Sequence, residues 1–97
     1  QDFVNDHAWG GVWTRPGLSL QTRSLITLAA LTALKAPQEL AGHVRGAINN
    51  GCTVEEIREV LLHCAVYAGV PASAEAFRAA QAAIDAFSHD LTGGKIK

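Results

Sequence analysis

This chain contains no methionine, and its first residue is glutamine. Because translation starts with methionine, we expect the natural protein to begin upstream of Gln1, by a single residue or by a longer leader segment. No signal peptide is recognisable, and no apolar run reaches the roughly 20 residues of a membrane-spanning helix. The longest run, residues 25–34, is interrupted by threonines. We therefore expect a cytoplasmic protein with no membrane partner.

An excess of charge of one sign is also missing. The chain has eight Lys and Arg residues and nine Asp and Glu residues, which gives a formal net charge of −1. Proteins that bind nucleic acids usually present a basic face, often with aromatic side chains beside it. No cluster of Lys or Arg follows such a spacing in this sequence. We therefore expect no nucleic-acid partner.

Cysteine is rare, and the two cysteines do not form a CxxC motif. Cys52 is predicted to lie in a loop and Cys64 inside a helix. Without a CxxC motif, the sequence supports neither a dithiol redox site nor a zinc knuckle. We expect two reduced thiols, as is usual in cytosolic proteins, although the spacing alone leaves a disulfide open.

What the chain does contain is the composition of one globular domain over residues 1–97. Apolar residues make up 48% of it, with no repeat or low-complexity tract. No segment is convincing as a strand, and the apolar residues recur at helical spacing. The expected fold class is all-α, a small helical bundle. Residues 1–18 are interpreted as a lead-in arm and residues 88–97 as a frayed tail.

Four helices are predicted, and most of their ends carry a recognisable signal. The first starts at the N-cap candidate Ser19, and the second has Pro37 in its first turn and Gly51 as a left-handed stop. The third starts with a capping box, the sequence TVEE at residues 53–56. The fourth follows from about residue 71. Because the connections are short, we expect the last three helices to be successive neighbours.

The predicted helices carry more apolar surface than one small core can cover. Residues 20–34 are apolar around nearly the whole circumference of the first helix. This pattern is typical of a helix that is buried on most sides. We therefore predict a homo-oligomer, in which neighbouring subunits cover this surface.

The second predicted helix places an acid and a histidine one turn apart. Glu39 and His43 share a face, where a carboxylate can orient an imidazole, and histidine exchanges protons near neutral pH. The competing interpretation is an exposed ion pair that contributes little. Because apolar residues such as Val44 and Ala47 flank the histidine, we expect its ring to be half-buried. This position favours a catalytic role for the pair.

The third predicted helix repeats the arrangement with His63 and Tyr67. If the second and third helices are neighbours, His63 is expected to approach His43. Two histidines together with Glu39 also suggest a metal triad. Because the metalloprotease motif HExxH is absent, we expect no metal.

Two arginines flank the turn PGLSLQT. Arg15 and Arg23 are candidate carboxylate clamps, with solvated charges as the alternative. Arg23 is the stronger candidate, because a cation in the first turn of a helix is unfavourable unless an anion compensates it. Trp13 either anchors the lead-in arm on the helices or roofs a pocket. The set suits a helical oligomer that binds a small organic acid and moves a proton.

Several motifs together resemble one family. The segments are WGGVWTRPGLSLQTRSLITLAAL and ELAGHVRGAINNGCTVEEIREVLLHCAVYAGVPASAEAF, and they are similar to the carboxymuconolactone decarboxylase family. The similarity covers about residues 8–87, and members usually carry a longer N-terminal segment. The resemblance implies a single domain of the alkylhydroperoxidase-like type that assembles into trimers or hexamers, with pockets near subunit contacts.

The resemblance also implies an activity. Such proteins decarboxylate 4-carboxymuconolactone to 3-oxoadipate enol-lactone without a cofactor, in the β-ketoadipate pathway of aromatic catabolism. The implied partner is a small carboxylated lactone. His43 would be the acid or oxyanion donor and Glu39 its orienting partner. The candidate substrate-binding residues are Arg15, Arg23, His63, Tyr67 and Trp13.

Two other functions stay open at this point. Alkylhydroperoxidase-like redox enzymes of the same superfamily use the motif C-x-x-C-x-x-x-H, but the two cysteine positions before His43 hold Ala36 and Glu39. One alternative is a peroxiredoxin-type enzyme that uses Cys52 or Cys64. The other is a non-catalytic helical oligomer that binds a metabolite.

Overall fold

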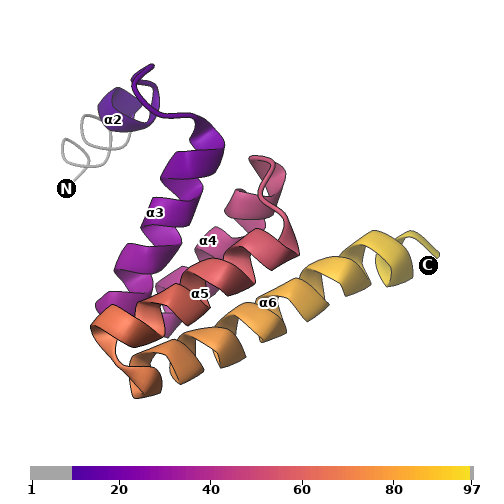
Figure 1. Ribbon diagram of the computed structural model, residues 1–97. Coiled ribbons are helices and arrows are strands. Elements are labelled where there is room, and N and C mark those ends of the chain that lie inside the picture. Colours follow the sequence, from indigo (N-terminus) through magenta and orange to yellow (C-terminus); the bar gives the residue numbers. More distant parts are fainter. Residues whose placement is uncertain (1–9, 97) are drawn as a thin grey trace.

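The chain is helical throughout most of the part that the structure describes. The computed structural model describes the backbone of residues 10–96 and the side chains as far as Ser88. These residues form five helices and no strand (Figure 1), which confirms the all-α class. The helices are α2 Gly11–Trp13, α3 Leu20–Ala33, α4 Pro37–Asn49, α5 Val54–Ala68 and α6 Val70–Ile96.

The four long helices form a bundle in which α3 and α6 each pack against both α4 and α5. Figure 1 shows α5 and α6 as a hairpin, with the end of α3 near the turn that joins them. The expected succession of neighbours holds for α5 and α6 but is wrong for α4 and α5. These two helices face each other across the core, because the apolar stripe of each also packs on α3 and α6.

The predicted helix ends are confirmed by local hydrogen bonds. Ser19 caps α3, and its Oγ accepts a hydrogen bond of 3.0 Å from the N–H of Thr22. Thr53 and Glu56 form the capping box of α5. At the end of α4, Gly51 has a φ of +100°. The N–H of Gly51 donates to Ile48 O and that of Cys52 to Ala47 O, both at 3.0 Å, which is the Schellman pattern.

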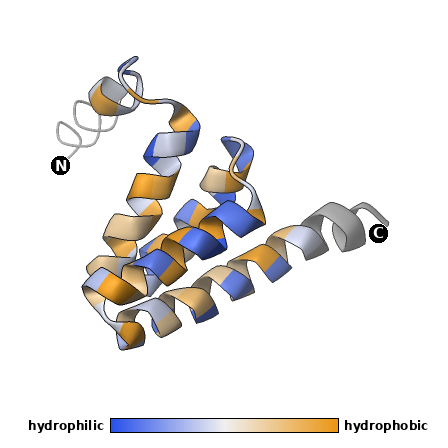
Figure 2. Ribbon diagram, in the orientation of Figure 1, coloured by the Kyte–Doolittle hydropathy of each residue, from blue (hydrophilic) through white to orange (hydrophobic). Residues whose placement is uncertain are grey.

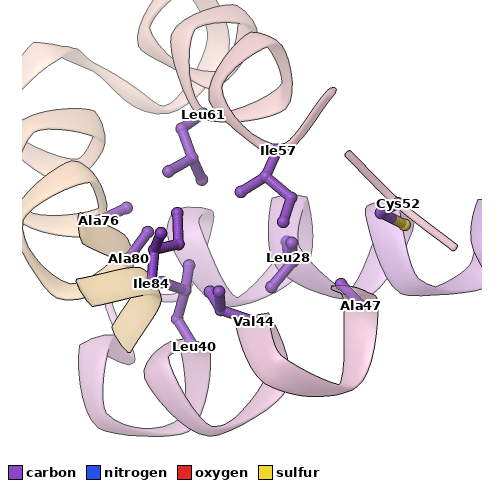
Figure 3. Close-up of a cluster of buried hydrophobic side chains, with 10 residues drawn as sticks. All are labelled: Leu28, Leu40, Val44, Ala47, Cys52, Ile57, Leu61, Ala76, Ala80 and Ile84. Atoms are coloured by element: carbon purple, nitrogen blue, oxygen red, sulfur yellow. The ribbon is translucent and has the colours of Figure 1, made fainter. Parts of the chain in front are cut away.

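The hydrophobic core lies where the four long helices converge (Figure 3). Leu28 of α3, Val44 of α4 and Ile57 of α5 point into one cluster and are completely buried. Burial of each such side chain contributes about 1.5–3 kcal/mol. The small side chains of Ala76 and Ala80 let α6 close one side of the cluster. The stripes predicted for α4 and α5 therefore form the core.

Helix α3 is buried on one face only within this chain. Its buried residues are Ser24, Leu28 and Thr32 at i,i+4 spacing. Ile26 and Leu34, by contrast, are 52% and 73% exposed. Figure 2 shows that hydrophobic residues dominate α3, whereas hydrophilic ones alternate with them along α5. The chain by itself therefore leaves much of the apolar surface of α3 exposed.

Helix α6 is longer than expected. The sequence predicted a frayed tail over residues 88–97, but the helix continues to Ile96. No proline interrupts this segment, and extending an existing helix is favourable because each added residue gains a hydrogen bond. Within the described residues, no helix is long and apolar enough to cross a membrane.

Candidate active site

A cavity lies between α2, α3 and α4, beside the histidine that the sequence singled out. Its volume is about 210 Å³. Sites for drug-sized ligands usually measure about 300–1,000 Å³, so this cavity suits a small metabolite. Its lining includes Trp13, Ser24, Thr27, His43, Gly46 and Asn50.

Two predicted site residues meet in this cavity. His43 projects from the middle of α4 and is half-buried, as predicted, and Trp13 ends the short helix α2. The turn after α2 is fastened to α3, because Nη2 of Arg23 donates to the carbonyl oxygen of Arg15 at 3.2 Å. Through Trp13, the described part of the lead-in arm thus supplies one wall of the cavity.

Three polar residues that sequence reasoning missed line the same cavity: Ser24, Thr27 and Asn50. Ser24 is 4% exposed, and its Oγ accepts a hydrogen bond of 2.9 Å from Nδ2 of Asn50. The available signal for Ser24 was a polar residue on the buried face of an apolar helix, one turn before Leu28. Asn50 carried no such signal, because an asparagine at a helix end is ordinary.

Three other predicted site residues are not among those that line this cavity. Glu39 is exposed, one turn before His43 on α4, and Arg15 is exposed after α2. Arg23 is half-buried in the first turn of α3 and precedes the cavity residue Ser24. Its Nε is buried without a hydrogen-bond partner among the described residues.

His63 and Tyr67 lie on the other side of α3. Their rings are 5.2 Å apart between centroids, and they border shallow cavities between α3 and α5. The cavity of His43 lies between α3 and α4. The predicted approach of His43 and His63 is therefore wrong within this chain, because α3 separates them. Among the described residues, no group of three or more His, Cys, Asp and Glu side chains is placed to hold a metal ion.

Sequence comparison decides the family. Residues 1–82 match the model of the carboxymuconolactone decarboxylase family. The chain belongs to this family. Membership confirms the resemblance that the motifs indicated, and it agrees with the all-helical fold.

Two relatives of this member of the carboxymuconolactone decarboxylase family are named as decarboxylases. The chain is 51% identical over 81 residues to the 4-carboxymuconolactone decarboxylase of Acinetobacter baylyi, covering 84% of this chain and 60% of the relative. It is also 51% identical over 85 residues to the nitrosuccinic acid decarboxylase of Metarhizium robertsii, covering 88% and 59%. The chain thus spans about 60% of the length of these relatives.

The thiols of this family member are poorly suited to nucleophilic chemistry. Cys52 and Cys64 are both unpaired and buried. Burial raises the pKa of both thiols, and the nearby carboxylate of Glu56 adds to the increase at Cys52. A raised pKa leaves little reactive thiolate at neutral pH. Neither sulfur is among the groups that line the cavity of His43.

Proposed function

We propose that this protein is a cofactor-independent carboxy-lyase that converts 4-carboxymuconolactone to 3-oxoadipate enol-lactone, a step of aromatic catabolism in the β-ketoadipate pathway. The observation that carries the proposal is the small cavity in which His43 meets Trp13 and buried polar groups. The 51% identity to a 4-carboxymuconolactone decarboxylase supports it. So does the unfavourable chemistry of the two thiols, which argues against the redox alternative.

The reaction needs an electron acceptor, not a nucleophile. In the proposed substrate, the departing carboxylate is vinylogous to the lactone carbonyl. When its C–C bond breaks, the electron pair moves through the ring double bond onto the carbonyl oxygen, and CO₂ leaves. The resulting dienolate then takes a proton on carbon to give the enol-lactone. The protein must therefore hold carboxylates, donate to an oxyanion and supply one proton.

The residues divide these tasks between them. His43, half-buried at the cavity, is proposed as the acid that protonates the dienolate carbon. Glu39 is proposed to orient its imidazole from one turn away on α4. Arg23, with a buried Nε that has no partner among the described residues, is proposed as a clamp for the carboxylate that stays, together with Arg15. Trp13 packs on the apolar part of the lactone.

The second relative supports the same type of chemistry. Nitrosuccinic acid, named in the Metarhizium relative, carries one carboxyl group on the carbon that bears the nitro group. Loss of CO₂ there places the electron pair on the nitro oxygens. Both named compounds are dicarboxylic acids with an electron-accepting oxygen conjugated to the carbon that loses CO₂. A site with a carboxylate clamp and an oxyanion donor serves either compound, and we propose the lactone.

We further propose that the protein acts in the cytoplasm as a homo-oligomer, a trimer or a hexamer. The support is the apolar surface that one subunit leaves open on α3 and α5, where Ile26, Leu62 and Val66 are 52%, 56% and 76% exposed. His63 and Tyr67 lie on this surface, and Tyr67 is 80% exposed. In the proposed assembly these two residues meet a neighbouring subunit, and they contribute to substrate binding from there.

The test is turnover by the purified protein. We expect 4-carboxymuconolactone to be consumed, with release of one CO₂ per lactone and formation of the enol-lactone. Chromatography and mass spectrometry measure the loss of the lactone and the appearance of the enol-lactone. Nitrosuccinic acid is the comparison substrate. We expect kcat/KM to be higher for the lactone than for nitrosuccinic acid. If the protein leaves the lactone unchanged, the proposed function is wrong.

A further inference from the structure

The cavity of His43 contains a hydroxyl group with an unusual hydrogen-bond arrangement. Ser24 is 4% exposed and lines the cavity. Its Oγ accepts from Nδ2 of Asn50 at 2.9 Å, and its own proton has no acceptor among the described residues. A hydroxyl group offers one donor and two acceptor positions. The Ser24 O–H can therefore still donate one hydrogen bond.

The other hydroxyls of α3 that are buried or half-buried do not share this property. Thr27 Oγ1 donates to the carbonyl oxygen of Arg23 at 2.9 Å. Thr32 Oγ1 donates to that of Leu28 at 2.8 Å. Both threonines thus use their protons within α3. Ser24, by contrast, lines the cavity with a hydroxyl proton that no described residue accepts, and this leaves the O–H free to donate to a ligand.

Asn50 is itself held firmly, so it can hold Ser24. Its backbone N–H donates to Gly46 O at 2.9 Å and to Ala47 O at 3.1 Å. The next residue, Gly51, accepts at its carbonyl oxygen from Nε2 of Gln21 at 3.1 Å. The end of α4 is therefore tied to the first turns of α3 at two points. With one acceptor position of Ser24 occupied by Asn50, the hydroxyl is pre-oriented before substrate arrives.

We infer that Ser24 donates its hydroxyl hydrogen bond to the lactone carbonyl oxygen as negative charge develops there, and that Asn50 is the positioning residue for Ser24. This inference rests on the proposed function and completes it. As CO₂ leaves, the electron pair reaches the carbonyl oxygen and Ser24 stabilises the dienolate. His43 then transfers its proton to carbon, and the product leaves Ser24 unchanged.

The first experiment compares steady-state kinetics of Ser24→Ala with wild type on 4-carboxymuconolactone. Loss of one oxyanion donor typically lowers kcat about 10²–10³-fold. Because the charge develops only in the transition state, we expect kcat to fall with KM nearly unchanged. Thr32→Val is the matched control. It removes a buried hydroxyl from the same face of α3, outside the cavity lining, and should keep the wild-type kcat.

The second experiment tests whether Asn50 acts through Ser24. We expect Asn50→Ala to lower kcat, and the double variant Ser24→Ala/Asn50→Ala to be no slower than Ser24→Ala alone. A purely structural role of Asn50 would instead add its own loss. Ser24→Cys, which keeps the size of the side chain but has a weak S–H donor, serves if Ser24→Ala unfolds. Circular dichroism checks folding of each variant.

The outcomes separate the two proposals. An active wild type with an equally active Ser24→Ala variant would overturn the role of Ser24 alone. A rise in KM at constant kcat would also overturn it, since the contact would then belong to the ground state. A wild-type protein without any turnover would overturn the proposed function and this inference together.

Discussion

Glu56 accepts a hydrogen bond from Gln21 across 35 positions of the sequence, with 3.1 Å between Oε1 of Glu56 and Nε2 of Gln21. The same carboxylate oxygen accepts from the backbone N–H of Thr53 at 2.9 Å. The first turn of α5 is therefore both capped and tied to the first turn of α3. These hydrogen bonds hold the pKa of Glu56 below its usual range, with the larger effect from the Thr53 N–H and the next from Gln21.

The lowered pKa of Glu56 predicts a loss of stability in acid. The carboxylate stabilises the folded state fully above the pKa of an unfolded glutamate, about 4.3, and this contribution is lost as the pH falls through the lower folded pKa. We expect Glu56→Gln to flatten the pH dependence of Tm between about pH 2 and 6. Thermal unfolding by circular dichroism measures it. Glu55→Gln, an exposed neighbour, should keep the wild-type slope; equal slopes in all three proteins would contradict the prediction.

Replacing His43 should remove most of the activity without unfolding the protein. We expect His43→Gln to lower kcat/KM for the lactone by about 10²–10⁴, the usual range for loss of a general acid, with a Tm close to wild type. His63→Gln should cost less, because His63 borders a different cavity on the other side of α3. Wild-type rates in His43→Gln would show that another group donates the proton.

A side chain at Gly46 should block the cavity while the helix tolerates it. A Cβ built on Gly46 meets no atom within 4 Å, and Gly46 lines the cavity of His43. Glycine inside a helix is about 0.8–1.0 kcal/mol less favourable than alanine, so Gly46→Leu should not lower Tm. We expect its kcat/KM to fall at least about tenfold, as 1.4 kcal/mol of lost binding would produce.

The control for Gly46 is a second glycine of the same helix. Gly42 also has open space around its Cβ position, but it is not among the residues that line this cavity. Gly42→Leu should therefore leave kcat/KM near the wild-type value. Equal losses in both variants would mean that leucine disturbs α4 itself, and the cavity would not explain the effect.

The cysteines should be dispensable for turnover and slow to react. Because burial raises the pKa of Cys52 and Cys64, little thiolate is available at neutral pH. We expect Ellman's reagent to label the native protein slowly and the denatured protein at once. The double variant Cys52→Ser/Cys64→Ser, checked for folding, should keep at least about half of the wild-type kcat/KM, a change below 1 kcal/mol. Loss of activity in a folded double variant would restore the thiol mechanism.

Charge on the exposed face of α3 and α5 should dissociate the proposed oligomer. Leu62 is 56% exposed on this face, and a carboxylate buried in an apolar contact is strongly unfavourable. We expect Leu62→Asp to elute as a smaller species in size-exclusion chromatography with light scattering. Gln38→Asp, on an exposed position of α4, is the control. An unchanged mass for Leu62→Asp would place the subunit contact elsewhere.

Much of the fold was predictable because its signals are local. The caps at Ser19 and Thr53 and the left-handed stop at Gly51 depend on hydrogen bonds to residues at most five positions away, and all three predictions were correct. The stripe that contains Leu40 and Val44 was also correct, because helical periodicity alone determines which residues share a face. The extent of α6 was underestimated, since the glycines near its end do not prevent the helix from continuing.

The candidate site was predictable only in part. His43 was recognisable from its type and its apolar flanks, whereas for Trp13 the sequence left open whether it anchors the lead-in arm or roofs a pocket. Ser24 and Asn50 are 26 positions apart, and their hydrogen bond joins the beginning of α3 to the end of α4. The expected meeting of His43 with His63 failed for the same reason. Periodicity assigns each side chain to a face of its own helix, whereas packing in three dimensions determines which faces of different helices meet, and here α3 came to lie between the two histidines.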